Sequence, residues 1–236
     1  PKTSEDPMPV ISFANSKGGS GKTTSALLLA CELAHAKPVT IIDADPRHPI
    51  TTWARLPNKP ERLTVVTNQS EKTILDEIEQ AAATDPFVIV DLEGTASRLT
   101  SYAISQSDLV IVPMKEQRQD ADAAIEIIKE IHRDMKAVRR IIPFAVLFTQ
   151  SKVVAKSRTA RFIARQFRDK PNIDTFETEI HERDAFAAIF AAGGSVRSLD
   201  TSEVNNLDAA IANVTAFAGE VIAKLKVNQQ PRQEVA

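Results

Sequence analysis

The sequence has one cysteine and no long apolar run, and each shortage excludes a class of protein. Because Cys31 has no second cysteine to pair with, an internal disulfide framework is excluded, and the composition suits a reducing compartment. The longest apolar stretches, residues 26–31 and 141–148, are too short to span a bilayer, which takes about 20 residues. The polar residues 1–9 contain no apolar signal-peptide core. We therefore expect a cytoplasmic protein.

The sequence also lacks an excess of either charge. It has 29 lysines and arginines against 31 aspartates and glutamates, so any surface for a nucleic acid must be a local patch. The four histidines are scattered, without the spacing of a metal site or a catalytic triad. With 236 residues, 43% of them hydrophobic, the chain can bury one sizeable core. We expect one domain and no metal site beyond magnesium.

Glycine is scarce, but three of the seven glycines stand together in residues 15–24, which read Asn-Ser-Lys-Gly-Gly-Ser-Gly-Lys-Thr-Thr. An apolar run at residues 10–14 precedes this stretch and a helix-forming run at residues 25–36 follows it, as in a phosphate-binding loop. The glycines let backbone N–H groups point at one anion, while Lys22 and Thr23 supply an ammonium group and a hydroxyl ligand for Mg²⁺. The N-terminal end of the following helix favours the same anion. The stretch predicts a nucleotide site.

Lys17 stands where the usual phosphate loop has glycine. A lysine followed by Gly-Gly-x-Gly-Lys-Thr-Thr is the deviant Walker A motif, and through it the chain resembles the ParA/MinD family of dimerising ATPases. The resemblance implies ATP and Mg²⁺ as cofactors, catalytic roles for Lys17 and Lys22, and a Lys17 that reaches across a homodimer interface to the partner's ATP. In this loop the resemblance implies nucleotide contacts from Lys17, Gly18, Gly19, Ser20, Gly21, Lys22, Thr23 and Thr24.

Apolar strands alternate with helical runs along the whole chain. Strands are expected at residues 10–14, 39–42, 63–67, 87–91, 109–112 and 142–149. Helices are expected at residues 23–36, 70–83, 121–135, 157–168, 182–192 and 204–226. This order predicts a single-domain α/β fold, a mostly parallel sheet flanked by helices as in P-loop NTPases, with ligands at the carboxyl ends of the strands. We expect a flexible extension at residues 1–9, the ATPase domain at 10–226 and a disordered tail at 227–236.

Carboxylates follow two of the predicted strands. Asp43 and Asp45 leave the second strand two residues apart, so in an extended segment their side chains point the same way. By resemblance, Asp45 is catalytic and linked to the attacking water, and Asp43 is a supporting group on the magnesium side. Asp91 follows four apolar residues, which is the Walker B arrangement. We expect Thr23, Asp43 and Asp91 to hold Mg²⁺, partly through water.

Two further positions are candidates for nucleotide contacts. Gly94 is the third residue after Asp91 and can offer a backbone N–H to the γ-phosphate, although many family members have Asp-x-Pro-Pro at this point. Glu93 has no assigned role. Gln150 follows the strand predicted at residues 142–149, and the resemblance implies a contact with the adenine base, with a plain loop position as the alternative.

A local basic patch lies between residues 152 and 170, which hold seven cationic side chains and one anionic one. At 100° per residue, the four arginines of the predicted helix fall within about an 80° arc. Arginine forks suit phosphate oxygens, and ParA-type proteins bind DNA as ATP dimers, so we expect non-specific DNA binding; a solvated helix face is the alternative. The candidate DNA-binding residues are Lys156, Arg158, Arg161, Arg165 and Arg168.

Within the family, the chain most resembles small plasmid-partition ParA proteins, and residues 181–188 also resemble the VirC-type ATPase of T-DNA transfer. The resemblance implies a slow, partner-stimulated ATPase that dimerises on ATP, binds DNA on the nucleoid and acts in DNA partition or segregation. The implied activator is a ParB-like centromere-binding protein or a relaxosome-type protein, and no membrane partner is expected. A VirC-like conjugative ATPase, a MinD-like membrane-positioning ATPase and a metabolic ATPase remain alternatives.

Overall fold

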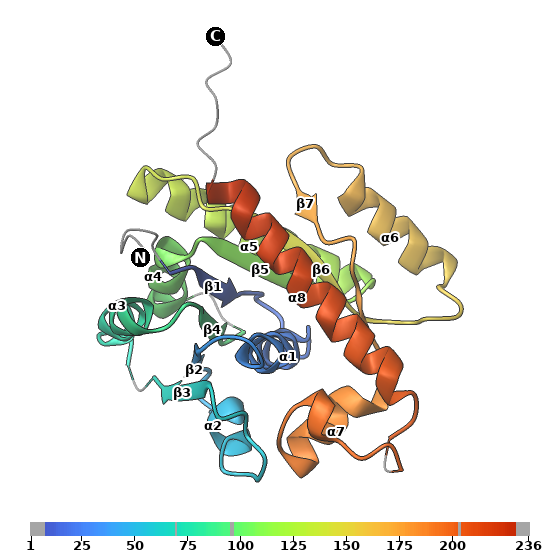
Figure 1. The fold of residues 1–236 in the computed structure, drawn as a ribbon. Helices are drawn as coiled ribbons and strands as arrows, with labels where there is room; N and C mark the ends of the chain where they lie inside the picture. The colour runs from blue at the N-terminus through green and yellow to red at the C-terminus, as the bar shows by residue number, and fades with distance from the viewer. Residues whose placement is uncertain (1–7, 69, 95–96, 203, 230–236) are drawn as a thin grey trace.

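The computed structural model describes residues 8–68, 70–94, 97–202 and 204–229. One sheet runs through the molecule, with the strand order β3-β2-β4-β1-β5-β6-β7 and β8 paired to β6 (Figure 1). All described strand pairs are parallel. The strands are β1 (Val10–Phe13), β2 (Val39–Ala44), β3 (Leu63–Thr67), β4 (Val88–Leu92), β5 (Leu109–Met114), β6 (Phe144–Ser151), β7 (Asp174–Thr175) and β8 (Ile180–His181).

Helices cover both faces of the sheet, which confirms the predicted α/β fold (Figure 1). Helices α1, α2, α7 and α8 pack on one face, and α3, α4, α5 and α6 pack on the other. Their bounds are α1 (Lys22–Ala34), α2 (Pro49–Trp53), α3 (Ile74–Thr84), α4 (Arg98–Gln106), α5 (Arg118–Val138), α6 (Arg158–Arg168), α7 (Asp184–Ala192) and α8 (Leu207–Gln229), with a 3₁₀ turn η1 (Val196–Ser198). Within the described ranges, no helix has both the length and the apolar character needed to cross a bilayer.

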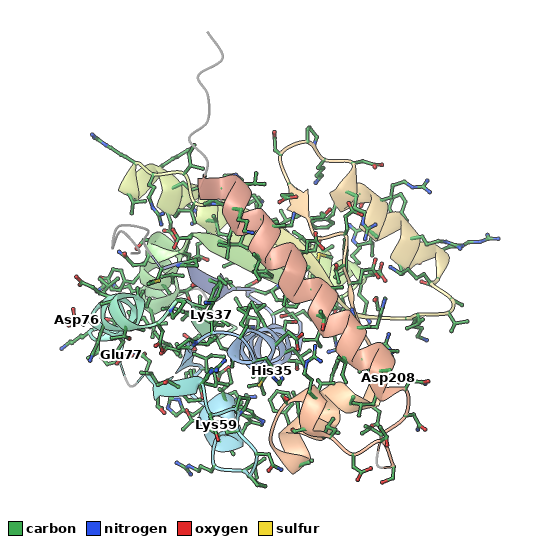
Figure 2. All side chains as sticks on the ribbon, in the orientation of Figure 1. His35, Lys37, Lys59, Asp76, Glu77 and Asp208 are labelled. Carbon is green, nitrogen blue, oxygen red and sulfur yellow. The ribbon has the colours of Figure 1, made fainter. Side chains whose placement is uncertain are left out.

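The central strands are apolar on both sides because both faces of the sheet are covered. In β1, Ile11 and Phe13 join one hydrophobic cluster, while Val10 joins the other. The covering helices are apolar on one side only. In α3, Ile74 and Ile78 are buried, whereas Asp76 lies on the outside of the molecule (Figure 2). Each buried side chain of this size contributes about 1.5–3 kcal/mol to folding.

The structure differs from the predicted elements at several places, and the short helix α2 was not among the predicted helices. Helix α4 was not predicted, because its nine residues bury a short apolar face; the Oγ of Ser97 caps it by accepting a hydrogen bond from the backbone N–H of Thr100 at 3.2 Å. Helix α8 ends at Gln229, so the prediction of a disordered tail was wrong for residues 227–229. The burial of Leu225 holds the last turns of α8 on the core. Residues 1–7 and 230–236, assigned to the flexible ends, lie outside the described residues.

The sheet brings the predicted acidic residues together. Parallel strands end at one edge, and the pairing of β2 with β4 places Asp43 directly beside Asp91. The pairing of β1 with β4 places Phe13 beside Asp91, so the loop that leaves β1 begins next to both carboxylates. The strand ends of β1, β2 and β4 therefore form the floor of the candidate site.

Candidate nucleotide-binding site

The phosphate loop connects β1 to α1, and its shape requires glycine. Gly19 and Gly21 have φ angles of +75° and +93°, in the left-handed region that residues with a Cβ rarely adopt. A Cβ on Gly21 would also lie 3.1 Å from the side chain of Thr149. The Thr149 hydroxyl donates a hydrogen bond to the carbonyl of Ser20 at 2.7 Å, so β6 supports the loop from below. Thr149 was not predicted as part of the site.

The ammonium group of Lys22 lies inside the loop. It donates hydrogen bonds to the carbonyl oxygens of Asn15 and Lys17, both at 3.2 Å. Burial lowers the pKa of Lys22, and the nearby carboxylates, with Asp91 foremost, act in the opposite direction. The two hydrogen bonds hold the ammonium group at the place where the glycine loop can receive phosphate groups.

Asp43 and Asp91 are completely buried at the floor of the site. Asp43 accepts a hydrogen bond on Oδ2 from the backbone N–H of Thr51 at 2.7 Å, but its Oδ1 has no partner. Neither oxygen of Asp91 receives a hydrogen bond of normal geometry, and burial raises the pKa of Asp91 to about 7, against the opposing effect of the Thr23 hydroxyl. Buried carboxylate oxygens without partners are unfavourable unless a cation neutralises them. The set of Thr23, Asp43 and Asp91 therefore fits a hydrated Mg²⁺.

A cavity of about 630 Å³ lies against the phosphate loop, and Asp43 and Asp91 are not among its lining residues. Its lining includes most of the predicted nucleotide residues, which are Gly18, Gly19, Gly21, Lys22, Thr23, Thr24, Gly94 and Gln150. Ser20 is buried and does not line it. Gly94 lies against the loop, because a Cβ there would lie 3.3 Å from the backbone nitrogen of Gly18 and 3.4 Å from Nζ of Lys22. Glu93, which had no assigned role, also lines the cavity.

A second cavity of about 370 Å³ adjoins the first and shares Gly21, Thr24, Gln150 and Phe190 with it. Its wall combines apolar side chains, Ile180, Phe186 and Phe190 among them, with the polar or charged side chains of Gln150, His181, Glu182 and Arg183. A cavity with apolar side chains and a few polar groups suits a heterocyclic base. The structure thus brings Gln150 and the loop at residues 180–183 to one place beside the phosphate loop.

Asp45, the predicted water-orienting residue, lies half-buried in the lining of the larger cavity. Its Oδ1 accepts a hydrogen bond from the backbone N–H of Arg47 at 2.9 Å, and its carbonyl accepts one from the N–H of His48 at 2.8 Å. These bonds fold the chain after β2 into a tight turn. Asp45 is therefore held in the lining of the cavity, close enough to Asp43 and Asp91 for its charge to act on both.

Lys17 is held within its own chain. Its ammonium group forms an ion pair with Asp120 of α5, which is completely buried, whereas the Lys17 side chain is 32% exposed. The backbone N–H of Lys17 donates to Oδ1 of Asn15 at 2.8 Å, and the Asn15 amide donates to the carbonyl of Pro113 at 2.7 Å. To reach a partner subunit, Lys17 has to leave Asp120. Asn15 and Asp120 were not predicted as site residues.

The basic helix α6 packs on the core through Ile163, Ala164 and Phe167, as its periodicity indicated. Long side chains that end in nitrogen extend from its outer side into solvent (Figure 2). Within the described part of the chain, Arg158, Arg161 and Arg165 are exposed and make no side-chain hydrogen bond or ion pair; we call these three the arginine face.

The other two candidate DNA-binding residues are engaged inside the protein. Lys156 donates to Glu116 at 2.7 Å and to Glu179 at 2.6 Å. Arg168 pairs with Glu179 at 3.0 Å and lies over the ring of Phe148, 5.5 Å from its centroid. The positive charge available to a polyanion on α6 is therefore that of the arginine face.

Comparisons with known proteins agree with this site. A family model described as VirC1 protein matches residues 8–222. A ParA protein of Rhizobium radiobacter is 38% identical over 219 residues, which cover 92% of this chain and 98% of that protein. A virC1 protein of Rhizobium rhizogenes is 28% identical over 192 residues, which cover 79% of this chain and 82% of that protein.

The fold has solved counterparts as well. A putative plasmid partition protein from Borrelia burgdorferi B31, determined with bound AMPPNP, has a TM-score of 0.66 at 17% identity and covers 91% of this chain and 100% of its own. At that identity the likeness shows a shared fold. The chain belongs to the VirC1 family, within the ParA/MinD-type P-loop ATPases.

Proposed function

We propose that the chain hydrolyses ATP slowly, dimerises while ATP is bound, and in that state holds DNA without sequence preference during DNA partition or segregation. The observation that carries this proposal is the phosphate loop with Lys22, set directly above two buried carboxylates that have unpaired oxygens. The ParA relative supports the role in partition.

The residues of the cavity have separate tasks in this reaction. The amides of residues 18–23 and the Lys22 ammonium bind the phosphates, and Asp45 orients the attacking water. Thr23, Asp43 and Asp91 hold Mg²⁺, which supplies neutralisation of the charge that develops on the β- and γ-phosphates. In the dimer, Lys17 leaves Asp120 and contacts the partner's ATP, so that bound nucleotide joins the two subunits.

Asp91→Asn is expected to stabilise the nucleotide-free protein and to weaken its binding of MgATP. The pKa of Asp91 is raised from its ordinary value of 3.8 to about 7, so between these values the folded state binds more protons than the unfolded state. The free energy of unfolding of the wild type therefore falls as pH rises through this window. The free energy of unfolding of the variant does not fall in this way, because asparagine stays neutral. We expect a gain of about 1–3 kcal/mol at pH 8.

Urea unfolding at pH 5 and pH 8 measures this difference. The advantage of the Asp91→Asn variant should be larger at pH 8, while calorimetry with MgATP should show weaker binding. Equal pH dependence of the two proteins, or undiminished MgATP affinity in the variant, would contradict the assignment of Asp91.

The arginine face is the proposed DNA-binding surface. Three unpaired guanidinium groups on one side of a helix bind phosphate oxygens without reading base edges. A dimer presents two such faces, so ATP-dependent dimerisation raises the number of phosphates neutralised without any new contact within a subunit. Each phosphate contact releases counterions, so DNA affinity is expected to fall steeply between about 50 and about 200 mM salt. ATP-dependent DNA shift assays at these two salt concentrations test the proposal.

The double variant Arg161→Glu with Arg165→Glu is expected to bind DNA roughly tenfold more weakly or worse, with a shallower dependence on salt, because each subunit loses two phosphate contacts. Its ATP affinity should not change. The matched control is Arg133→Glu with Lys136→Glu, which makes the same change of charge on the exposed side of α5. If both double variants lose the same DNA affinity, net charge explains the loss and the arginine face does not.

Conjugative DNA processing is the second candidate function, because the matching family model is that of VirC1. The activator is then a relaxosome-type protein, whereas partition calls for a ParB-like centromere-binding protein. Deletion of the gene separates the two. Partition predicts plasmid loss during growth without selection, and conjugative transfer predicts a lower transfer frequency with normal plasmid retention.

A further inference from the structure

One cationic side chain in the lining of the larger cavity has no role in the reaction proposed above. Among the described residues that line it, the cationic ones are Lys22 and Arg47, and the anionic ones are Asp45 and Glu93. Arg47 stands in the turn between β2 and α2, on the rim of the cavity. Its side chain is exposed, and in the described part of the structure its guanidinium group makes no hydrogen bond or ion pair.

The turn holds the backbone of Arg47 in place. Two hydrogen bonds to Asp45 define the turn. The backbone N–H of Arg47 donates to Oδ1 of Asp45, and the backbone N–H of His48 donates to the carbonyl of Asp45. His48 adopts a left-handed φ of +47°, and Pro49 then begins α2. The root of the Arg47 side chain is therefore fixed beside Asp45 at the cavity, while its guanidinium group remains free to turn toward a ligand.

Apart from the proposed Mg²⁺, the protein's own side chains offer a triphosphate little positive charge at this site. Lys17 is neutralised by Asp120 in the isolated chain, so Lys22 is the only cation that the loop itself offers to a triphosphate. Asp45 and Glu93 line the same cavity, and both repel phosphate groups. A monomer that captures ATP before it dimerises therefore gains from a further positive charge at the rim.

We propose that Arg47 binds the terminal phosphates of ATP within its own chain, as the second cation beside Lys22 while Lys17 is still held by Asp120. This inference rests on the proposed ATPase function and assigns one more nucleotide-binding residue to it. A guanidinium fork can pair with two phosphate oxygens at once, which a single ammonium group cannot do. Arg47 thereby favours a triphosphate over a diphosphate.

Arg47→Gln in the full chain tests this assignment, with binding of ATPγS and ADP in the presence of Mg²⁺ measured by calorimetry at low protein concentration. Loss of one charge-assisted phosphate contact is expected to weaken ATPγS binding about tenfold and ADP binding less than threefold. The ATPγS affinity of Arg47→Lys is expected to lie between that of Arg47→Gln and that of the wild type. The matched control is Arg55→Gln, which removes an exposed arginine near the end of α2 that does not line the cavity, and it should bind as the wild type does.

Unchanged ATPγS affinity in Arg47→Gln would overturn the inference, and so would an equal loss for ATPγS and ADP. The burial of Trp53 provides the folding control, because its fluorescence reports the intact core around α2. If the wild type itself bound neither nucleotide, the proposed ATPase function would fail together with this inference. That outcome is distinct from a wild type that binds ATPγS and an Arg47→Gln variant that binds it equally well.

Discussion

Lys17→Ala is expected to abolish ATP-dependent dimerisation and to leave a folded monomer that still binds nucleotide. The substitution removes the ammonium group but keeps the backbone bond from residue 17 to Asn15, so the loop retains its shape. In a symmetric dimer the change removes two contacts with phosphate at once. Loss of one buried charged partner at an interface costs about 2–5 kcal/mol. Because two such contacts are lost, we expect the dissociation constant of the dimer to rise by more than roughly a thousandfold.

Sedimentation velocity with MgATPγS measures this effect. Asp120→Asn is the matched control, because it breaks the same ion pair and leaves the Lys17 ammonium free. We expect this control to dimerise at the same or a lower nucleotide concentration than the wild type. A Lys17→Ala protein that sediments as a dimer with ATPγS would remove the proposed role of Lys17 across the interface.

Asp45→Ala is expected to trap the ATP-bound dimer, with hydrolysis reduced by about 10²-fold or more, because the carboxylate assigned to orient the attacking water is removed. Nucleotide binding should persist, since Lys22 and the loop amides are untouched. The substitution also removes the acceptor for the backbone N–H of Arg47. Asp45→Asn keeps an oxygen for that bond and loses only the charge.

Phosphate release and sedimentation with MgATP, measured on the same samples, distinguish these effects. If the carboxylate is needed for its charge, both Asp45 variants lose turnover and both remain dimeric. If Asp45→Asn hydrolyses ATP at the wild-type rate, the residue acts by fixing the turn that carries Arg47. Wild-type turnover in Asp45→Ala would refute both roles.

The fold and the phosphate loop could be predicted because their signals are local. The loop lies within ten consecutive residues, and the strands before Asp43 and Asp91 are short apolar runs that end on a carboxylate. Their parallel arrangement then follows from the alternation of strands and helices, and the structure confirms the predicted fold class.

The supporting contacts could not be predicted, because they join residues far apart in the sequence. Asp120 lies 103 positions from Lys17, and Thr149 lies 129 positions from Ser20. Neither stands in a pattern that sets it apart. Only the packing of α5 and β6 beside the phosphate loop shows that they hold it.

Helix α6 also shows that contacts between distant parts of the sequence could not be predicted. Its periodicity correctly separated the packed residues Ile163 and Phe167 from the exposed arginines. It could not show that Glu179 pairs with Lys156 and Arg168, because that carboxylate comes from the segment before β8. The charge of a patch depends on partners that a helical wheel does not contain.

Isothermal titration calorimetry with ATPγS and Mg²⁺ tests the central claim most directly, namely that the glycine loop and its two buried carboxylates form a nucleotide site. We predict saturable binding of one nucleotide per chain, lost in Lys22→Ala and strongly reduced when Mg²⁺ is removed. The absence of saturable heat with the folded wild-type protein at millimolar nucleotide, or binding by Lys22→Ala equal to that of the wild type, would contradict it.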